Sequence, residues 1–80
     1  LKHLYFSIDL DGLNPSCAPA VESPYPGGPD VNQIICLLHI LQHHFTFIGM
    51  DISEMIPSLD HTHSTALSAA RILKEFYSVI

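Results

Sequence analysis

The chain has 80 residues, of which 48% are hydrophobic and 14% are charged, and its formal net charge is -5. This composition is typical of one small globular unit, and it excludes a disordered tail and a chain of several domains. A chain of this length buries only about 60% of the surface that its unfolded form exposes, so a stable fold requires a partner, a cross-link or an unusually good core. The chain has only three cationic residues, Lys2, Arg71 and Lys74. They are too few for the basic surface that phosphate backbones require, so we expect no binding to nucleic acid.

The cysteines and the first residues bear on location and completeness. Cys17 lies among prolines, Cys36 lies in an apolar run, and no signal-peptide pattern is found. We therefore expect free thiols and a cytoplasmic protein, with mitochondria as the alternative location for the full-length protein. The sequence begins with Leu1, not methionine, and the apolar residues of a predicted strand begin at Leu4. We expect a piece of a longer polypeptide.

A buried strand and a long loop are predicted first. Residues His3 to Leu10 are rich in apolar and aromatic side chains and are followed by Gly12 and Pro15, which is typical of a short buried strand. The stretch 11–29 contains five of the six prolines and three of the four glycines of the chain. Neither a helix nor a strand can persist through such a stretch, so we expect a stiffened loop.

A helix is predicted next. Asp30 can cap its first turn, and Gln33 three residues later completes a capping box. Apolar residues then recur at helical spacing and predict a helix over 30–43 with an unusually broad apolar face that buries Cys36. The stretch from Val31 to Met50 has no Asp, Glu, Lys or Arg and is long enough for a membrane span, but its Asn, Gln and His residues would be costly in a bilayer. We therefore expect no membrane segment.

A second strand and a second helix complete the pattern. Residues Thr46 to Ile52 form another short apolar, β-favouring run that ends before Pro57. Small and apolar residues at helical spacing predict a last helix over 62–78, with a core face formed by Ala66, Ala69, Ala70, Leu73, Phe76 and Tyr77. The order strand, helix, strand, helix predicts a βαβα unit with parallel strands, cut from a larger α/β sheet.

Carboxylates follow both predicted strands. In open α/β sheets, ligands bind at the carboxyl ends of the strands. Asp9 and Asp11 lie there two residues apart, so strand alternation would place both side chains on one face. Asp51 and Glu54 occupy the equivalent end of the second strand, and no Lys or Arg is near in sequence. Four carboxylates at one rim favour a bound cation, most simply a divalent metal, although an Asp at a strand end can also do no more than stabilise a turn.

Six histidines offer a second kind of metal site. His39 and His43 are one helical turn apart, and His61 and His63 flank one residue, so either pair could hold zinc. Neither pair has a third or fourth ligand at motif spacing. Surface or core histidines without a metal are the commoner outcome.

The surrounding residues resemble a known family. Ser7, Asp9, Asp11, Pro15 and Pro19, followed by the pair Gly27-Gly28, reproduce the S-x-D-x-D-x-x-x-P-x-x-x-P loop of the arginase/agmatinase (ureohydrolase) family. The segment 49–57, G-M-D-I-S-E-M-I-P, resembles the G-x-D-x-x-E-x-x-P segment of that family, and residues 65–70 resemble its final T-A-x-x-A-A helix. The resemblance implies a three-layer αβα fold with a parallel sheet. Residues 1–80 would be a C-terminal βαβα portion of one such domain, which lacks its N-terminal part.

The resemblance also implies the chemistry. Asp9 matches the carboxylate that bridges two Mn(II) ions, Asp11 matches a ligand of one ion, and Glu54 matches the acid that pairs with the substrate guanidinium. The two ions would lower the pKa of a shared water near neutral pH, and the resulting hydroxide would attack the guanidino or amidino carbon and release urea. Glu54 would orient the planar cation through charge-assisted hydrogen bonds.

The family supplies its other metal ligands from upstream G-x-x-H and D-A-H-x-D segments, which residues 1–80 do not contain. We therefore expect the isolated chain to be inactive, although the family that it resembles consists of Mn-dependent hydrolases. The alternative is a truncated homologue without catalytic activity that serves as a binding or remnant module. The substrate could be arginine, agmatine, guanidinobutyrate or formimidoylglutamate, and residues 21–24 look more like agmatinases and plant arginases. The broad apolar helix face and open sheet edges predict a homo-oligomer for the complete protein.

Overall fold

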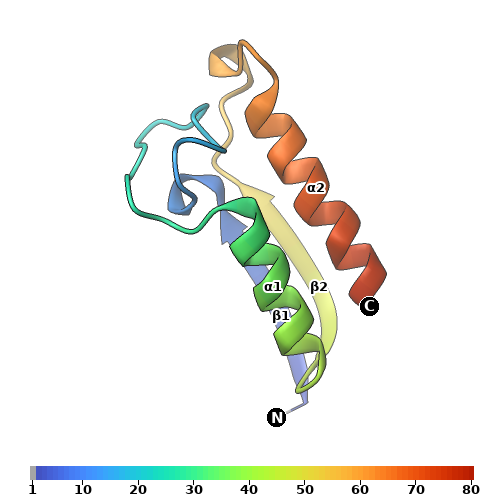
Figure 1. Ribbon diagram of the computed structural model, residues 1–80. Coiled ribbons are helices and arrows are strands. Elements are labelled where there is room, and N and C mark those ends of the chain that lie inside the picture. The colour runs from blue at the N-terminus through green and yellow to red at the C-terminus, as the bar shows by residue number, and fades with distance from the viewer. Residues whose placement is uncertain (1) are drawn as a thin grey trace.

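Two strands and two long helices alternate along the chain, and a short 3-10 helix follows each strand (Figure 1). The computed structural model describes residues 2–80. Its elements are β1 (His3–Asp9), η1 (Leu10–Gly12), α1 (Val31–Gln42), β2 (Thr46–Ser53), η2 (Pro57–Leu59) and α2 (Ser64–Val79). The predicted order is confirmed, and each predicted boundary lies within two residues of the observed one. The loop from 13 to 30 contains neither an α-helix nor a strand, as its prolines and glycines predict.

The strands β1 and β2 form a two-stranded parallel sheet, which confirms the predicted orientation. Asp9 at the end of β1 pairs with Ser53 at the end of β2. The pairing shifts by one residue between Leu4 and Tyr5, so that Tyr5 lies opposite Gly49. A Cβ atom at Gly49 would lie 2.9 Å from the Tyr5 ring, so a larger residue at this position would displace the ring.

The two faces of the sheet have different environments. Leu4, Phe6 and Ile8 alternate along β1 and belong to the core or pack against it. Tyr5, between them, keeps 54% of its surface exposed. Both helices contribute side chains to the same core, so both cover the same face of the sheet. Within residues 2–80, the opposite face is open to solvent, and we call it the open face.

A capping box begins α1, as predicted. The Asp30 carboxylate accepts a hydrogen bond from the Gln33 amide, and the Gln33 side chain accepts one from the Asp30 amide, both at 2.9 Å. Ile34 and Leu38 form the buried face of the helix. The predicted burial of Cys36 is wrong, because this residue lies midway between those two and therefore on the opposite side of the helix, where it is exposed.

The buried face of α2 differs from the predicted one. The sequence pattern places Leu73 and Tyr77 in the core, but these side chains are 40% and 67% exposed. The buried residues are Thr65, Ile72 and Phe76, whose spacings of seven and four place them on one side of the helix. Leu73 and Tyr77 lie outside this stripe, on a side that no element of residues 2–80 covers.

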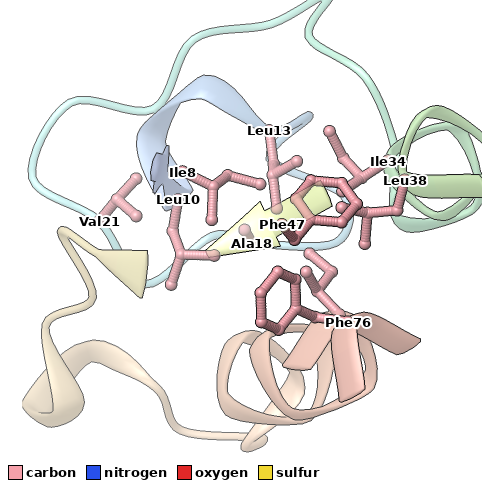
Figure 2. Packing of buried hydrophobic residues seen from close by; sticks show 10 residues of the cluster. Ile8, Leu10, Leu13, Ala18, Val21, Ile34, Leu38, Phe47 and Phe76 are labelled. Carbon is pink, nitrogen blue, oxygen red and sulfur yellow. The ribbon is translucent and has the colours of Figure 1, made fainter. Parts of the chain in front are cut away.

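The core lies between the sheet and the helices. Figure 2 shows Phe47 of β2 beside Ile34 and Leu38 of α1 and Phe76 of α2. The rings of Phe47 and Phe76 meet edge to face with their centroids 5.4 Å apart, a favourable geometry for an aromatic pair. The core continues beneath the loop that follows β1, through the buried side chains of Leu10, Leu13, Ala18 and Val21.

A polar bridge joins the two helices. His39 of α1 and Glu75 of α2 lie 2.6 Å apart, from Nε2 to Oε2, and Arg71 donates to Oε1 of Glu75 at 2.6 Å. The hydrogen bonds from Arg71 and then His39 lower the pKa of Glu75 to about 2. Gln42 Nε2 lies 3.1 Å from His39 Nδ1, so an imidazole with its proton on Nε2 satisfies both neighbours.

Two further predictions concern the membrane and the thiols. The uncharged stretch from Val31 to Met50 is divided between α1, a turn and β2. Within residues 2–80, no helix combines the length and the apolar character that a membrane span requires. Cys17 and Cys36 are both free thiols, as predicted.

Candidate functional site

Asp9 and Asp11 lie beside a cleft at the carboxyl end of the sheet. Asp9 is the last residue of β1, and Asp11 lies in η1 directly after it. Both residues line a cleft of about 520 Å³ between β1, η1 and the first half of α1. The rest of the lining is mostly apolar and includes Phe6, Ile8, Leu13, Pro29, Ile34 and Leu37. Two aspartates thus border one largely apolar hollow.

Asp11 reaches this cleft by a different route from the predicted one. Strand alternation was expected to align it with Asp9, but Asp11 lies in a 3-10 helix. Leu10 and Leu13 are each only 1% exposed, and the chain turns between them so that both enter the core. The Leu13 amide donates to the Leu10 carbonyl at 3.2 Å and closes this turn. Burial of two leucines, and not the strand period, therefore places Asp11.

On the open face, each strand carboxylate is hydrogen-bonded to a serine of the other strand. Ser53 Oγ donates to Asp9 Oδ1 at 2.7 Å, and Ser7 Oγ donates to Asp51 Oδ1 at 2.8 Å. Both pairs are direct register partners. A hydrogen bond to the Asp51 carboxylate raises the pKa of the Tyr5 hydroxyl above its ordinary value, with smaller contributions from partial burial and from the negative charge of Asp51.

The predicted gathering of four carboxylates at one rim is not observed. Within residues 2–80, no three His, Cys, Asp or Glu side chains lie close enough to hold a metal ion together. Asp51 is bonded to Ser7, two register pairs before the pair formed by the strand ends, and Glu54 is not part of the cleft lining. Asp9 and Asp11 are the two predicted site residues that share the cleft.

Glu54 directly follows β2 in an unusual backbone conformation. Its φ is 76°, in the left-handed region. This conformation costs a residue other than glycine about 1–3 kcal/mol, and such residues concentrate at functional sites. Two residues later, the Ile56 amide donates to the Ala20 carbonyl at 2.7 Å. The chain is therefore held immediately after the strained residue.

Buried hydrogen bonds tie the loop after β1 to the segment after β2. The Ala20 amide donates to Thr65 Oγ1 at 3.0 Å, while the Ala20 carbonyl accepts from Ile56. The Asp60 carboxylate accepts from the amides of Thr65 at 3.1 Å and Ala66 at 3.0 Å. Burial raises the pKa of Asp60, but these amide donors outweigh it and leave the pKa below the ordinary value. Both loops at the strand ends thus share one polar anchor on α2.

The histidine pairs do not form a metal centre within the described chain. His39 is engaged by Glu75 in the bridge between the helices. His61 and His63 are exposed in the turn before α2. Neither pair belongs to a group of three ligands among residues 2–80.

Sequence reasoning missed Ser53. A signal was nevertheless available, because Ser7-x-Asp9 in β1 is mirrored by Asp51-x-Ser53 in β2. When two such parallel strands pair in register, each carboxylate lies opposite a serine. Recognising this pattern required the register, which the sequence alone does not provide.

Comparison with known proteins identifies the family. The model of the arginase family matches residues 1–78. The chain belongs to the arginase family. It is 38% identical over 69 residues to an agmatinase from Chromobacterium violaceum, an alignment that covers 86% of this chain and 21% of that protein. It is 36% identical over 81 residues to the mitochondrial arginase 1 of Arabidopsis thaliana, which covers 100% of this chain and 23% of the relative.

Solved structures of the arginase family agree with this assignment. The agmatine ureohydrolase of Thermoplasma volcanium superposes with a TM-score of 0.84 at 33% identity, over 98% of this chain and 26% of that one. The arginase of Bacillus subtilis gives 0.81 at 28% identity, over 94% and 26%. The predicted fold class is confirmed, because the βαβα unit matches part of an arginase-like α/β fold. The chain spans about a fifth to a quarter of the length of these relatives.

Proposed function

We propose that this chain is the C-terminal segment of a ureohydrolase that uses two Mn(II) ions to hydrolyse a guanidino or amidino C–N bond and release urea. The main support for this proposal is that Asp9 and Asp11 lie beside one cleft at the carboxyl end of the sheet, where ligands bind in α/β folds. The family supports a hydrolase of this class, since its relatives include an agmatinase and an arginase.

Asp9 and Asp11 have the donor chemistry that manganese prefers. Carboxylate oxygens are hard ligands, and Asp9 is exposed while Asp11 is half-buried. The ion pairs found within residues 2–80 all involve Glu75, so no cationic side chain there neutralises either aspartate. Two carboxylates cannot complete a site for two ions, so the remaining ligands would come from parts of the polypeptide outside residues 2–80. When bound, the two ions supply a water of lowered pKa and stabilise the negative charge that develops during attack.

Glu54 is the proposed partner of the substrate cation. Its side chain is exposed and accepts no hydrogen bond within residues 2–80, so both carboxylate oxygens are available. A carboxylate binds a planar guanidinium through two parallel N–H donors, which fixes orientation as well as charge. The left-handed backbone at Glu54 and the bond from Ile56 to Ala20 set the direction in which the chain leaves β2. Glu54 would thereby hold the reacting carbon in one orientation.

Substrate and assembly belong to the same proposal. Agmatine and arginine are the leading candidate substrates because the relatives are named agmatinase and arginase, and formimidoylglutamate is the alternative substrate. We place the complete protein in the cytoplasm or mitochondria as a homo-oligomer without nucleic-acid or membrane partners. The second candidate function is that of a binding module without catalysis. It is favoured by the lack of a third metal ligand within residues 2–80.

Urea release tests the proposal. The natural polypeptide that carries residues 1–80 is assayed with Mn(II) and with agmatine, arginine, guanidinobutyrate or formimidoylglutamate, and its coding sequence is read for G-x-x-H and D-A-H-x-D segments. We expect both segments and urea release from one guanidino compound, with Asp9→Asn and Glu54→Gln strongly impaired. Glu22→Gln is the matched control, since Glu22 is an exposed loop carboxylate outside the cleft.

The two functions give opposite results in this assay. Formimidoylglutamate is followed by loss of substrate, because its hydrolysis releases formamide in place of urea. A polypeptide that turns over none of the four compounds and lacks the upstream segments is a non-catalytic homologue. Activity in which Glu54→Gln and Glu22→Gln behave alike would remove Glu54 from the proposed role.

A further inference from the structure

The carboxylates of Asp9 and Asp11 differ in how firmly the chain holds them. Ser53 Oγ donates to Asp9 Oδ1 at 2.7 Å. This distance is typical of a strong hydrogen bond between a hydroxyl and a carboxylate. No side chain of residues 2–80 donates a hydrogen bond to Asp11. One carboxylate of the cleft is therefore held before any ion arrives, and the other is not.

The position of Ser53 makes this bond a property of the fold. Ser53 is the last residue of β2 and the register partner of Asp9. Ladder pairing therefore brings the hydroxyl to the carboxylate without help from a flexible loop. Asp9 itself is exposed, so packing restrains its side chain little and this bond is its main restraint among the described side-chain contacts. A group that is already ordered loses less conformational entropy when it binds a ligand.

The bond also distinguishes the two oxygens of Asp9. Oδ1 accepts from Ser53, whereas Oδ2 accepts no hydrogen bond within residues 2–80. An oxygen that already accepts a hydrogen bond has one lone pair occupied, so the free oxygen is the better ligand for a cation. Partners of this kind orient metal-binding carboxylates and tune their affinity.

We propose that Ser53 is a positioning residue for Asp9, whose hydroxyl fixes one carboxylate oxygen and so presets the orientation in which Asp9 binds a divalent cation. This inference rests on the proposed function, because it requires Asp9 to be a metal ligand. It assigns Ser53 no contact with the ion or the substrate. The residue acts only through the Asp9 carboxylate.

A matched variant exists on the same face of the sheet. Ser7 donates to Asp51 Oδ1 at 2.8 Å, two register pairs before the pair at the strand ends. Ser7 itself lines the cleft, but the carboxylate that it binds belongs to Asp51, which does not. Ser7→Ala therefore removes a serine–carboxylate bond of the same geometry that involves no proposed ligand. Ser53→Thr keeps the hydroxyl and suits a strand.

Titration with Mn(II), followed by electron paramagnetic resonance of the free ion, measures the effect without an activity assay. In the natural polypeptide that carries this segment, we expect Ser53→Ala to raise the Kd for Mn(II) by about tenfold or more. Ser53→Thr and Ser7→Ala should bind as the unchanged polypeptide does. Thermal unfolding without metal shows that each variant is folded.

The outcomes separate this inference from the proposed function. If the unchanged polypeptide binds no Mn(II), the manganese site fails and the role of Ser53 fails with it. If it binds Mn(II) and Ser53→Ala leaves the Kd unchanged, only the positioning role is overturned. Equal weakening by Ser53→Ala and Ser7→Ala also overturns it, because the effect would then belong to the open face as a whole.

Discussion

Replacement of Thr65 by valine tests whether the polar anchor on α2 stabilises both loops at the strand ends. Valine matches threonine in shape but lacks the hydroxyl that accepts the Ala20 amide at 3.0 Å. Both residues are 0% exposed, so water cannot take the place of the lost acceptor without a rearrangement. The expected result is a destabilised protein with a loosened loop after β1.

The magnitude follows from the geometry of the anchor. A buried donor left without a partner costs about 1–3 kcal/mol, and the added methyl group of valine recovers only part of this. Against the typical stability of a domain, about 5–15 kcal/mol, the loss is a substantial fraction. The hydrogen bond from the Ile56 amide to the Ala20 carbonyl should also weaken, because it holds the same residue as the bond that is removed.

Equilibrium unfolding in urea of the polypeptide that carries this segment measures the loss, and hydrogen exchange locates it at the amides of Ala20 and Ile56. Thr65→Ser keeps the hydroxyl and should retain their protection. Thr62→Val is the surface control, because Thr62 is exposed and bonds only to Ser64 within residues 2–80. A change for Thr65→Val within about 0.5 kcal/mol, the usual range of a surface substitution, would refute the reasoning.

Two further predictions concern charge and close packing. Glu75 has a pKa of about 2 in the folded protein against an ordinary value of 4.5, so protons bind the unfolded state first as the pH falls. We expect the stabilisation by Glu75 to be present above pH 4.5 and to be lost as the pH falls from 4.5 to 2. In unfolding experiments, Glu75→Gln should make the free energy of unfolding less dependent on pH in this range. A Cβ atom at Gly28 would overlap the Gly12 carbonyl oxygen, whereas one at Gly12 would meet nothing within 4 Å. Gly28→Ala should therefore lower the melting temperature clearly more than Gly12→Ala, and equal effects would contradict this packing.

The order and bounds of the elements could be predicted because their signals are local. Asp30 and Gln33 form the capping box that their spacing predicts. The prolines and glycines of the loop from 13 to 30 exclude regular structure whatever packs against them. Parallel pairing follows once a helix connects two short apolar strands. Each of these inferences needs only neighbours along the chain.

The predictions that were wrong concern features that depend on tertiary packing. The spacing of apolar residues in α2 allows more than one buried face, and the observed one includes Thr65, a polar residue whose hydroxyl accepts from the Ala20 amide. The exposure of Cys36 depends on where α1 meets the sheet. Asp11 reaches the cleft through a turn that buries Leu10 and Leu13. These outcomes depend on contacts between distant residues, which periodicity does not report.

The open face connects the stability of the chain to its proposed chemistry. Parallel sheets are normally covered on both sides, yet Tyr5 is 54% and Ile48 is 65% exposed on these strands. In the proposed function, the missing metal ligands come from outside residues 2–80, and so would the layer that covers this face. Metal affinity and folding free energy are then coupled, since the same added chain supplies ligands and buries apolar surface. In the proposed function, the Asp9–Ser53 pair takes part in both, because it closes the strand pairing and because its carboxylate would bind the ion.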